Sequence, residues 1–273
     1  MEVCMIRNNI ASVMVALVLV LALGCATSPL GRRQVKIHSS QEMEQLGVLS
    51  FQQIKTDMRH SGDWATRGYV QCVAHAILSA MPGENPAAWE VVVFEDESAN
   101  AFALPGKKIG VNTGLLSVAA NQDQLAAVIG HEVGHVIADH SNERVSQAKL
   151  AQVGMALAQV AGQGMGMSPE KQQLLGLLGV GVQVGVLLPY SRIHEAEADL
   201  IGLDLMANAG FDPAQSVSLW ENMSQGGGAP PELLSTHPSH STRIAGLSKR
   251  IPAAQALRNA ARAGGAVPRC SVR

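Results

Sequence analysis

This 273-residue sequence has few aromatic residues, a small net charge and few long apolar runs. Phe, Trp and Tyr together make up 3% of the chain, although hydrophobic residues of all kinds reach 47%. An apolar content made of Ala, Val, Leu and Met, together with 27 glycines, favours closely packed helices over a β-sandwich. The formal net charge of −2 excludes a global positive field, so we expect no nucleic-acid partner.

The uncharged run near the N-terminus is too short to cross a membrane. Residues 10–24 form a 15-residue uncharged stretch, whereas a helical span needs about 20 residues. A stretch of this length is typical of a signal-peptide core. We therefore expect residues 1–24 to be a lipoprotein signal peptide and residues 25–38 to be an extended tether. An ordinary signal peptide or an uncleaved anchor is the alternative.

The segment ALGC, which ends at Cys25, resembles a lipobox, the motif whose cysteine is lipidated and becomes the new N-terminus. By resemblance to known sorting rules, Ala26 after this cysteine favours the bacterial outer membrane over the inner one. We expect the mature protein to be lipid-anchored at Cys25 on the periplasmic face of that membrane.

Cysteine is also scarce, with four in the chain. Cys4 lies in the expected signal peptide and Cys25 is the expected lipidation site, which leaves Cys72 and Cys270. These two can form a disulfide in an oxidising compartment. The sequence does not show whether their Cα atoms come close enough, so pairing and two free thiols both stay open.

Hydrophobic periodicity predicts an α+β fold that is mostly helical. The alternating and β-branched stretches WEVVVF, NAFAL and KKIGVN predict one buried strand followed by a hairpin-like pair. One proline-free helix is expected over 121–147, with Asn121 as its N-cap and Gln124 completing a capping box. Further helices are expected over 39–58, 65–80, 148–188 (buried or amphipathic, over the active site) and 189–213. We expect a catalytic domain over 39–250 and a basic C-terminal tail over 251–273.

The motif HEVGH at 131–135 carries the strongest chemical signal. On a helix, His131 and His135 are one turn plus about 40° apart, so both imidazoles reach one point. Glu132 can reach a water molecule bound at that point. Neutral imidazoles are zinc ligands, and a catalytic zinc needs a third protein ligand and an open position for water. A surface helix with two histidines is the alternative, but the apolar flanks LAAVIG and VIA favour a buried metal site.

The third ligand is expected from a second helix. A metzincin would place Gly at 138 and His at 141, but this chain has Ala138 and Ser141, with His140 out of register. The dense acidic stretch SRIHEAEADL (191–200) supplies carboxylates instead. Glu195 is the expected ligand, and His194 is its main rival.

Helical spacing separates the other charged residues of that stretch. Asp199 is four residues after Glu195 and shares its face, so it can accept the outer N–H of a ligand histidine. Glu197 points about 200° away from Glu195 and is expected to face elsewhere. Arg192 precedes Glu195 by three residues, where it could neutralise an acid or hold the substrate backbone.

These motifs resemble the gluzincin peptidases that include the CAAX prenyl proteases, HtpX and the mitochondrial Oma-type proteases. The likeness is greatest to the bacterial outer-membrane lipoprotein branch, the BepA/LoiP-like metalloproteases. Four stretches carry it in family order across most of 89–250: NAFALPGKKIGVNTGLL, QLAAVIGHEVGHVIADHS, PYSRIHEAEADLIGLDLMANAGFDP and STHPSHSTRI. The resemblance implies a zincin-like domain with a small sheet beside the HEVGH helix, and one zinc ion per chain held by His131, His135 and Glu195, with Glu132 as general base.

The same resemblance assigns roles to two further stretches. Residues Asn100, Ala101, Phe102 and Ala103 resemble the family's active-site edge strand, against which a peptide would pair. His237, in the THP stretch, would stabilise the tetrahedral intermediate, or bind zinc and block it until substrate arrives; His240 is the alternative.

We therefore expect a zinc endopeptidase of the bacterial envelope that cleaves misfolded or misassembled periplasmic and outer-membrane proteins. Its expected partners are those substrates, the outer membrane and, as one option, outer-membrane assembly machinery. A chaperone-like or assembly-assisting lipoprotein with a latent, self-inhibited zinc site is the alternative of a different class. A cell-wall amidase is a third hypothesis.

Overall fold

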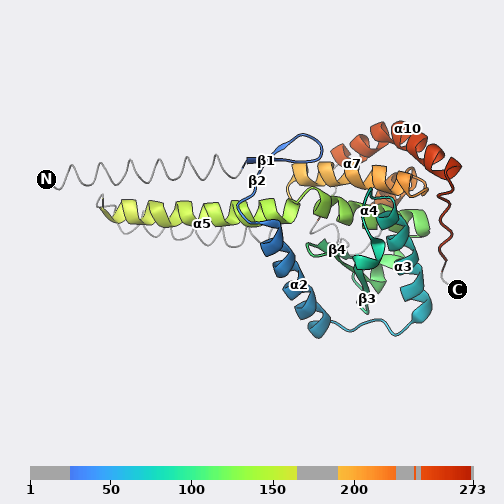
Figure 1. Ribbon diagram of the computed structural model, residues 1–273, viewed down its shortest axis with the longest axis horizontal. Coiled ribbons are helices and arrows are strands. Elements are labelled where there is room, and N and C mark those ends of the chain that lie inside the picture. Colours follow the sequence, from blue (N-terminus) through green and yellow to red (C-terminus); the bar gives the residue numbers. More distant parts are fainter. Residues whose placement is uncertain (1–24, 165–189, 226–236, 238–240, 272–273) are drawn as a thin grey trace. The chain divides into compact units, whose positions relative to one another are not determined.

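The computed structural model describes residues 25–164, 190–225, 237 and 241–271, and Figure 1 labels its helices and strands. The chain divides into two compact units, one formed by residues 1–40 and 141–188 and the other by residues 41–140 and 189–273. The second unit contains the residues predicted for the metal site. None of the described helices combines the length and apolarity needed to cross a bilayer.

The expected tether is a folded hairpin in the first unit. Strands β1 (Cys25–Thr27) and β2 (Arg33–Val35) pair antiparallel, which corrects the prediction of an extended 25–38 segment. Arg32, in the connecting turn, forms an ion pair of 2.6 Å with Glu143 of helix α5 (His140–Gly164). The expected signal peptide over 1–24, and residues 165–188 of the helices expected over 148–188, lie outside the described residues.

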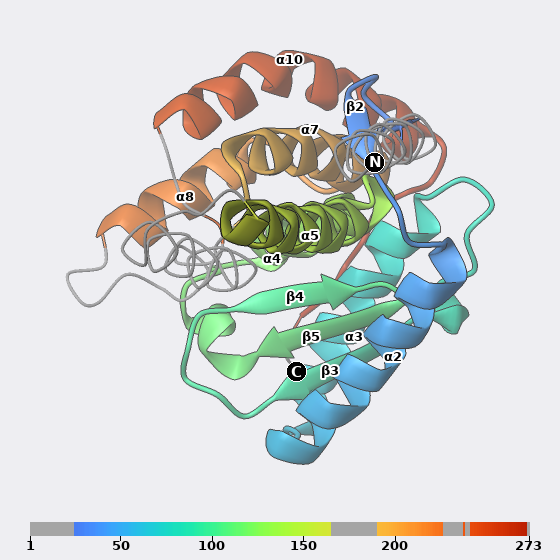
Figure 2. The ribbon, with the colours of Figure 1, turned by 90° about the vertical axis from the view of Figure 1, so that its left-hand side faces the viewer.

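A three-stranded sheet forms one side of the second unit. Its strands β3 (Glu90–Phe94), β4 (Ala101–Leu104) and β5 (Lys108–Asn112) are ordered β3-β5-β4. The expected hairpin is confirmed, because β4 and β5 pair antiparallel around a turn in which Gly106 has a φ of 80°. β3 pairs in parallel with β5, so β4 is an edge strand, and it lies on the side nearest α4 (Figure 2).

Two helices cover the sheet. Helix α2 (Ser40–Asp57) places the ring of Phe51 edge-on to Phe94 and Phe102, at centroid distances of 6.3 and 6.2 Å. Helix α3 (Trp64–Ser79) contributes fully buried residues to the main core, which includes Ile109 and Val111 of β5. Its N-terminus is capped by Asp63. Short 3-10 turns at Pro86–Ala88 and Thr113–Ser117 flank the strands.

Helix α4 (Gln122–Ile137) carries the HEVGH motif and ends earlier than predicted. Asn121 caps it by accepting hydrogen bonds from the N–H groups of residues 123 and 124, as expected. The Gln124 side chain accepts from the N–H of Ala120, one residue before the cap. The single helix expected over 121–147 is wrong, because Asp139 has a φ of 55° and separates α4 from α5. Aspartate enters this left-handed region more readily than most residues.

Helix α7 (Arg192–Asn208) packs against α4 at very short range, and α8 (Gln215–Gln225) follows it. Glycines make the α4–α7 approach feasible. A Cβ on Gly202 would lie 2.6 Å from the backbone N of His131, and one on Gly134 would lie 2.8 Å from the carbonyl oxygen of Ala198. This crossing therefore places the two motif-bearing helices backbone against backbone, near the positions predicted to hold a metal.

The C-terminal region is a helix followed by a segment bonded back to the core. Helix α10 (Ser241–Ala263) runs across the expected domain boundary at 250/251, so the separate basic tail is incorrect. Beyond it, Cys270 forms a disulfide with Cys72 of α3, with Cα atoms 5.7 Å apart. Of the two options that the sequence left open, the structure has the paired form.

Candidate metal centre

Four side chains from two helices and one loop converge on a single point. Helix α4 supplies His131 and His135, α7 supplies Glu195, and His237 comes from the segment before α10. All four are buried, with exposed fractions of 7% or less. Among the described residues this is the one His/Cys/Asp/Glu group with the spacing of a metal site.

The distances between the four ligand atoms match those around a tetrahedral ion. His131 Nε2 lies 3.0 Å from His135 Nε2 and 3.2 Å from His237 Nδ1. Oε1 of Glu195 lies 3.0 Å from His237 Nδ1 and 3.4 Å from His135 Nε2. Ligand atoms placed about 2.0–2.1 Å from a tetrahedral zinc are separated by about 3.3 Å.

The hydrogen bonds behind the two α4 histidines also fit a cation. Nδ1 of His131 lies 3.0 Å from Oδ1 of Asp199, so Nδ1 carries a proton, and Nε2 is the nitrogen that faces the cluster. Nδ1 of His135 in turn lies 2.9 Å from Nδ1 of His140. Two Nε2 atoms that face each other with lone pairs repel unless a positive charge lies between them. The residues present therefore fit zinc, bound by nitrogen and carboxylate donors.

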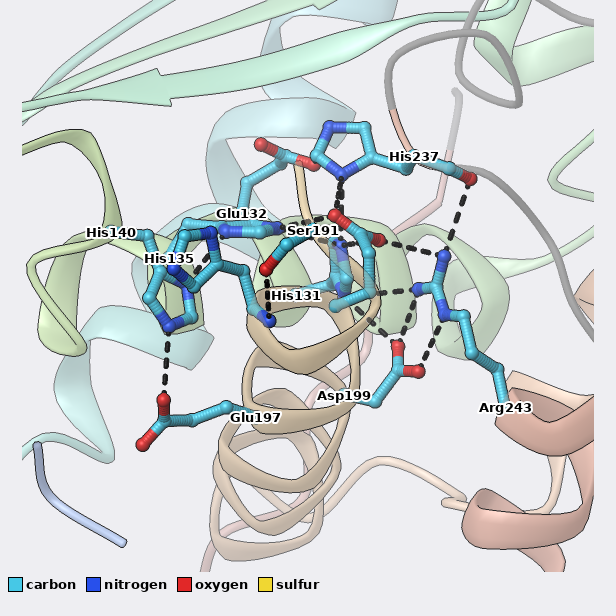
Figure 3. A network of polar contacts seen from close by, with 11 residues as sticks. His131, Glu132, His135, His140, Ser191, Glu197, Asp199, His237 and Arg243 are labelled. Atoms are coloured by element: carbon cyan, nitrogen blue, oxygen red, sulfur yellow. Dashed lines mark hydrogen bonds and ion pairs between the residues drawn. The ribbon is translucent and has the colours of Figure 1, made fainter. Parts of the chain in front are cut away.

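Arg243 holds the two carboxylates of α7 in place. Its Nη1 lies 2.7 Å from Oε2 of Glu195, and its Nε and Nη2 lie 2.7 and 2.6 Å from the two oxygens of Asp199 (Figure 3). The guanidinium also stacks on Trp220 at 4.2 Å and donates to the carbonyl oxygen of His237. Although burial opposes ionisation, Arg243 and His131 keep the pKa of Asp199 below its ordinary value.

Glu132 lies between the cluster and the sheet. Its Oε1 is 3.4 Å from Nε2 of His237, and its carboxylate also contacts the backbone N–H of Ala103 in β4. Burial raises the pKa of Glu132 above its ordinary value, against the opposing effect of the neighbouring histidines. A carboxyl group with a raised pKa can take a proton from water and release it again near neutral pH.

The residues of the expected substrate strand lie in and just before β4, the edge strand next to β5 in the sheet. Asn100 directly precedes β4, and its carbonyl oxygen accepts from the N–H of Asn112. Backbone bonding alternates along an antiparallel pair, so Ala101 and Ala103 direct their backbone groups away from β5. The ring of Phe102 lies over Gly110, and a side chain at position 110 would collide with this ring.

Arg192 does not take part in the site. Its side chain is exposed at the first turn of α7, and the arginine that contacts Glu195 and Asp199 is Arg243. The sequence patterns assigned no role to Arg243, although it stands in the STHPSHSTRI stretch of the family resemblance. That stretch was the signal that could have identified it.

Glu197 and His140 were also missed. Glu197 was expected to face elsewhere, yet it is 5% exposed and its Oε2 lies 3.1 Å from Nε2 of His140. His194, the rival ligand, is outside the four-residue cluster, and its ring stacks on His140 at 4.5 Å. The helical spacing correctly separated Glu197 from Glu195, but it carried no information about a partner on another element.

The sequence comparisons agree with this geometry. The family model described as Peptidase family M48 matches residues 65–251, which include all four residues of the cluster. The chain belongs to peptidase family M48. This membership agrees with the expected zincin-like, mostly helical fold, and the four-residue cluster lies within the matched region.

Two mitochondrial enzymes and one bacterial enzyme illustrate the similarity. Mitochondrial metalloendopeptidase OMA1 of Schizosaccharomyces pombe is 37% identical over 193 residues, covering 70% of this chain and 54% of that protein. Bovine mitochondrial metalloendopeptidase OMA1 is 32% identical over 246 residues, covering 84% of this chain and 46% of that protein. The β-barrel assembly-enhancing protease of Escherichia coli is 29% identical over 167 residues, covering 58% of this chain and 33% of that protein. The chain spans about half the length of the curated mitochondrial relatives it matches.

These comparisons contradict the cellular location expected from the sequence. The expectation of a bacterial envelope protease on the periplasmic face of the outer membrane is wrong, because the relatives of higher identity are mitochondrial metalloendopeptidases. The lipid anchor at Cys25, the outer-membrane contact and the assembly machinery are likewise unsupported, and membership of the bacterial lipoprotein branch is not confirmed. The chaperone-like alternative is not favoured either.

Proposed function

We propose that this chain is a zinc-dependent endopeptidase that cleaves extended segments of unfolded or misassembled proteins. One observation carries the proposal: Glu132 lies between the four-residue cluster and the edge strand β4. A general base, a metal site and a peptide-pairing edge are thereby adjacent. His131, His135 and Glu195 are the proposed ligands for catalysis, and the ion would supply a Lewis acid and a water molecule of lowered pKa.

The chain's own groups then perform the proton transfers. Glu132 takes a proton from the attacking water and delivers it to the nitrogen of the leaving amine. Its buried position favours the protonated form that must exist between these two transfers. Asp199 and Arg243 keep Glu195 and His131 oriented throughout, since both are held by hydrogen bonds or ion pairs of 3.0 Å or less.

Substrate selection is proposed to depend on backbone rather than side chains. The N–H and C=O groups of Ala101 and the C=O group of Ala103 point away from β5, on the side where an extended peptide can add as a further strand. Only a chain segment without its own secondary structure offers free backbone groups for such pairing. This argument favours unfolded protein over folded protein as the substrate.

His237 is proposed to act as a gate. Together with His131, His135 and Glu195 it occupies all four positions of a tetrahedral arrangement, whereas a catalytic site keeps one position open for water. Hydrolysis therefore requires His237 to move away. Between the two roles considered for this residue, the distances favour the inhibitory one.

We propose a mitochondrial location, because the relatives of higher identity are named as mitochondrial metalloendopeptidases. Fractionation of cells from the source organism, followed by detection of the native chain, would test this. Recovery with a compartment other than mitochondria would contradict it.

The activity is tested with the purified chain, a fluorescent unfolded protein and the same protein in its folded form. We expect about one zinc per chain, cleavage of the unfolded substrate only, and loss of cleavage by about 100- to 10,000-fold in Glu132→Gln. The variant should keep its zinc, because Glu132 is not a proposed ligand. A wild-type chain that binds no zinc, or a Glu132→Gln variant that cleaves normally, would contradict the proposal.

A further inference from the structure

A second set of buried polar residues lies behind His135, on the side away from the proposed metal position. Nδ1 of His135 is 2.9 Å from Nδ1 of His140, and Nε2 of His140 is 3.1 Å from Oε2 of Glu197 (Figure 3). His140 is fully buried, and Glu197 is 5% exposed. Burying an imidazole and a carboxylate costs free energy unless they are paired. Nothing in the reaction described above uses either of them.

His135, His140 and Glu197 form a row of hydrogen-bonded side chains, and Glu197 at its end determines which atoms donate and which accept. An ionised carboxylate can only accept hydrogen bonds, so the nitrogen of His140 that faces Glu197 carries the proton. A neutral imidazole then has a lone pair on its other nitrogen, Nδ1. That lone pair accepts the proton of His135 Nδ1, which leaves the Nε2 lone pair of His135 directed at the cluster. Nε2 is the atom that lies 3.0 Å from His131 Nε2 and 3.4 Å from Glu195.

The break between α4 and α5 makes this row feasible. His135 and His140 are five residues apart, so in one continuous helix their side chains would point about 140° apart. Asp139, with a φ of 55°, ends the helical path and turns His140 back toward His135. Glu197 reaches His140 from α7 because it stands on a different face from Glu195, which is directed at the cluster.

We propose that Glu197 and His140 are positioning residues that hold His135 in the tautomer needed to bind zinc through Nε2. This inference rests on the proposed zinc-dependent function. Each α4 histidine has its own support: Asp199 contacts His131 directly, whereas Glu197 acts on His135 through the ring of His140. The two carboxylates that support the histidines come from one helix, α7, which also supplies the ligand Glu195.

Zinc affinity of the full chain, measured by competition with a chelator, tests the proposal. Glu197→Ala removes the acceptor, and His140→Phe keeps a ring beside His194 but removes both nitrogens. We expect each to weaken zinc binding about 10- to 100-fold, as loss of a hydrogen-bonding partner behind a ligand does. Glu197→Gln retains an acceptor oxygen and should lie closer to wild type. Glu90→Ala is the matched control, because it removes a partly buried carboxylate paired with Lys55 and Lys108 in the sheet.

Coupling and tautomer state distinguish positioning from general damage to the fold. If the residues act in series, Glu197→Ala adds little further loss of zinc affinity in a His140→Phe background. Nitrogen-15 NMR of labelled histidines should show His135 protonated at Nδ1 in the wild-type chain with zinc and without it. In metal-free Glu197→Ala, His135 should no longer be held in that single form.

The outcomes separate this inference from the proposed function. A wild-type chain without zinc would refute the function itself. A zinc-binding wild type whose Glu197→Ala and His140→Phe variants bind zinc within about twofold of it would overturn only the positioning role. Should Glu197→Ala fail to fold, the wild-type spectrum still decides, because a metal-free His135 protonated at Nε2 contradicts the proposed row of hydrogen bonds.

Discussion

Nδ1 of His237 lies 3.0 Å from Oε1 of Glu195, although the two residues are 42 positions apart in the chain. The contact fills the fourth position around the proposed ion, so we predict that His237→Ala raises cleavage of an unfolded protein. If about one molecule in ten is open at any moment, the rate should rise on the order of tenfold. Initial rates with saturating zinc measure this effect.

Zinc affinity should fall in the same variant, because one of four donors is lost. His75, an exposed residue of α3 that contacts the Ser79 hydroxyl, offers a control for the removal of a histidine outside the site. His75→Ala should leave both rate and affinity unchanged. A His237→Ala variant with lower cleavage and unchanged zinc affinity would instead support a role in stabilising the tetrahedral intermediate.

The glycine contacts between α4 and α7 predict opposite effects of one substitution at two positions. Gly202→Ala places a Cβ 2.6 Å from the backbone N of His131, so α7 must move away from α4. We expect a loss of about 1–3 kcal/mol in the free energy of unfolding, together with weaker zinc binding. Gly246→Ala, in an open position of α10, should stabilise by about 0.5–1 kcal/mol. Equal unfolding midpoints in urea for the two variants would contradict the packing described here.

Two arginine–aspartate pairs differ in burial and should differ in their contribution to stability. The Arg243 side chain is 3% exposed, and its removal takes away the guanidinium that pairs with both buried acids, Glu195 and Asp199. Arg243→Ala should therefore cost about 3–5 kcal/mol in the metal-free chain. Arg250, whose side chain is 42% exposed, pairs with Asp204 at the same 2.6 Å, and Arg250→Ala should cost about 0–1 kcal/mol. Denaturant unfolding of both variants in chelator makes the comparison, and similar losses would refute it.

The stability of the metal-free chain should fall as the pH rises above 6.5. Burial alone would lower the pKa of His131, but Asp199 and Glu195 raise it from 6.5 to about 9. A raised histidine pKa stabilises the fold fully below the unfolded value of 6.5, and this stabilisation is lost as the pH approaches about 9. In the zinc-bound chain His131 is neutral throughout, so this loss does not occur.

The difference in melting temperature between zinc-loaded and chelated protein should consequently widen between pH 6.5 and about 9. The Asp199→Asn variant lacks one of the two charges that raise the pKa of His131 and should show a smaller widening. A constant difference across this range would contradict the assignment of the proton to His131.

Local patterns in the sequence determined much of this protein. Hydrophobic alternation and turn residues predicted β4 and β5, and Asn121 marked the start of α4. Helical spacing in HEVGH and SRIHEAEADL selected His131, His135 and Glu195, because residues four apart share a helix face whatever the helix packs against. These inferences depend only on residues close together in the chain.

The tertiary structure decided how those helices meet and which distant residues complete the site. Gly134 and Gly202 allow α4 and α7 to approach, and Arg243, 44 residues beyond Asp199, neutralises the acids of α7. Asp139 interrupts a helix that the sequence pattern continues, which brings His140 to His135 and gives Glu197 a buried partner. Such contacts join residues far apart in the chain or follow from a single backbone dihedral, and helical periodicity encodes neither.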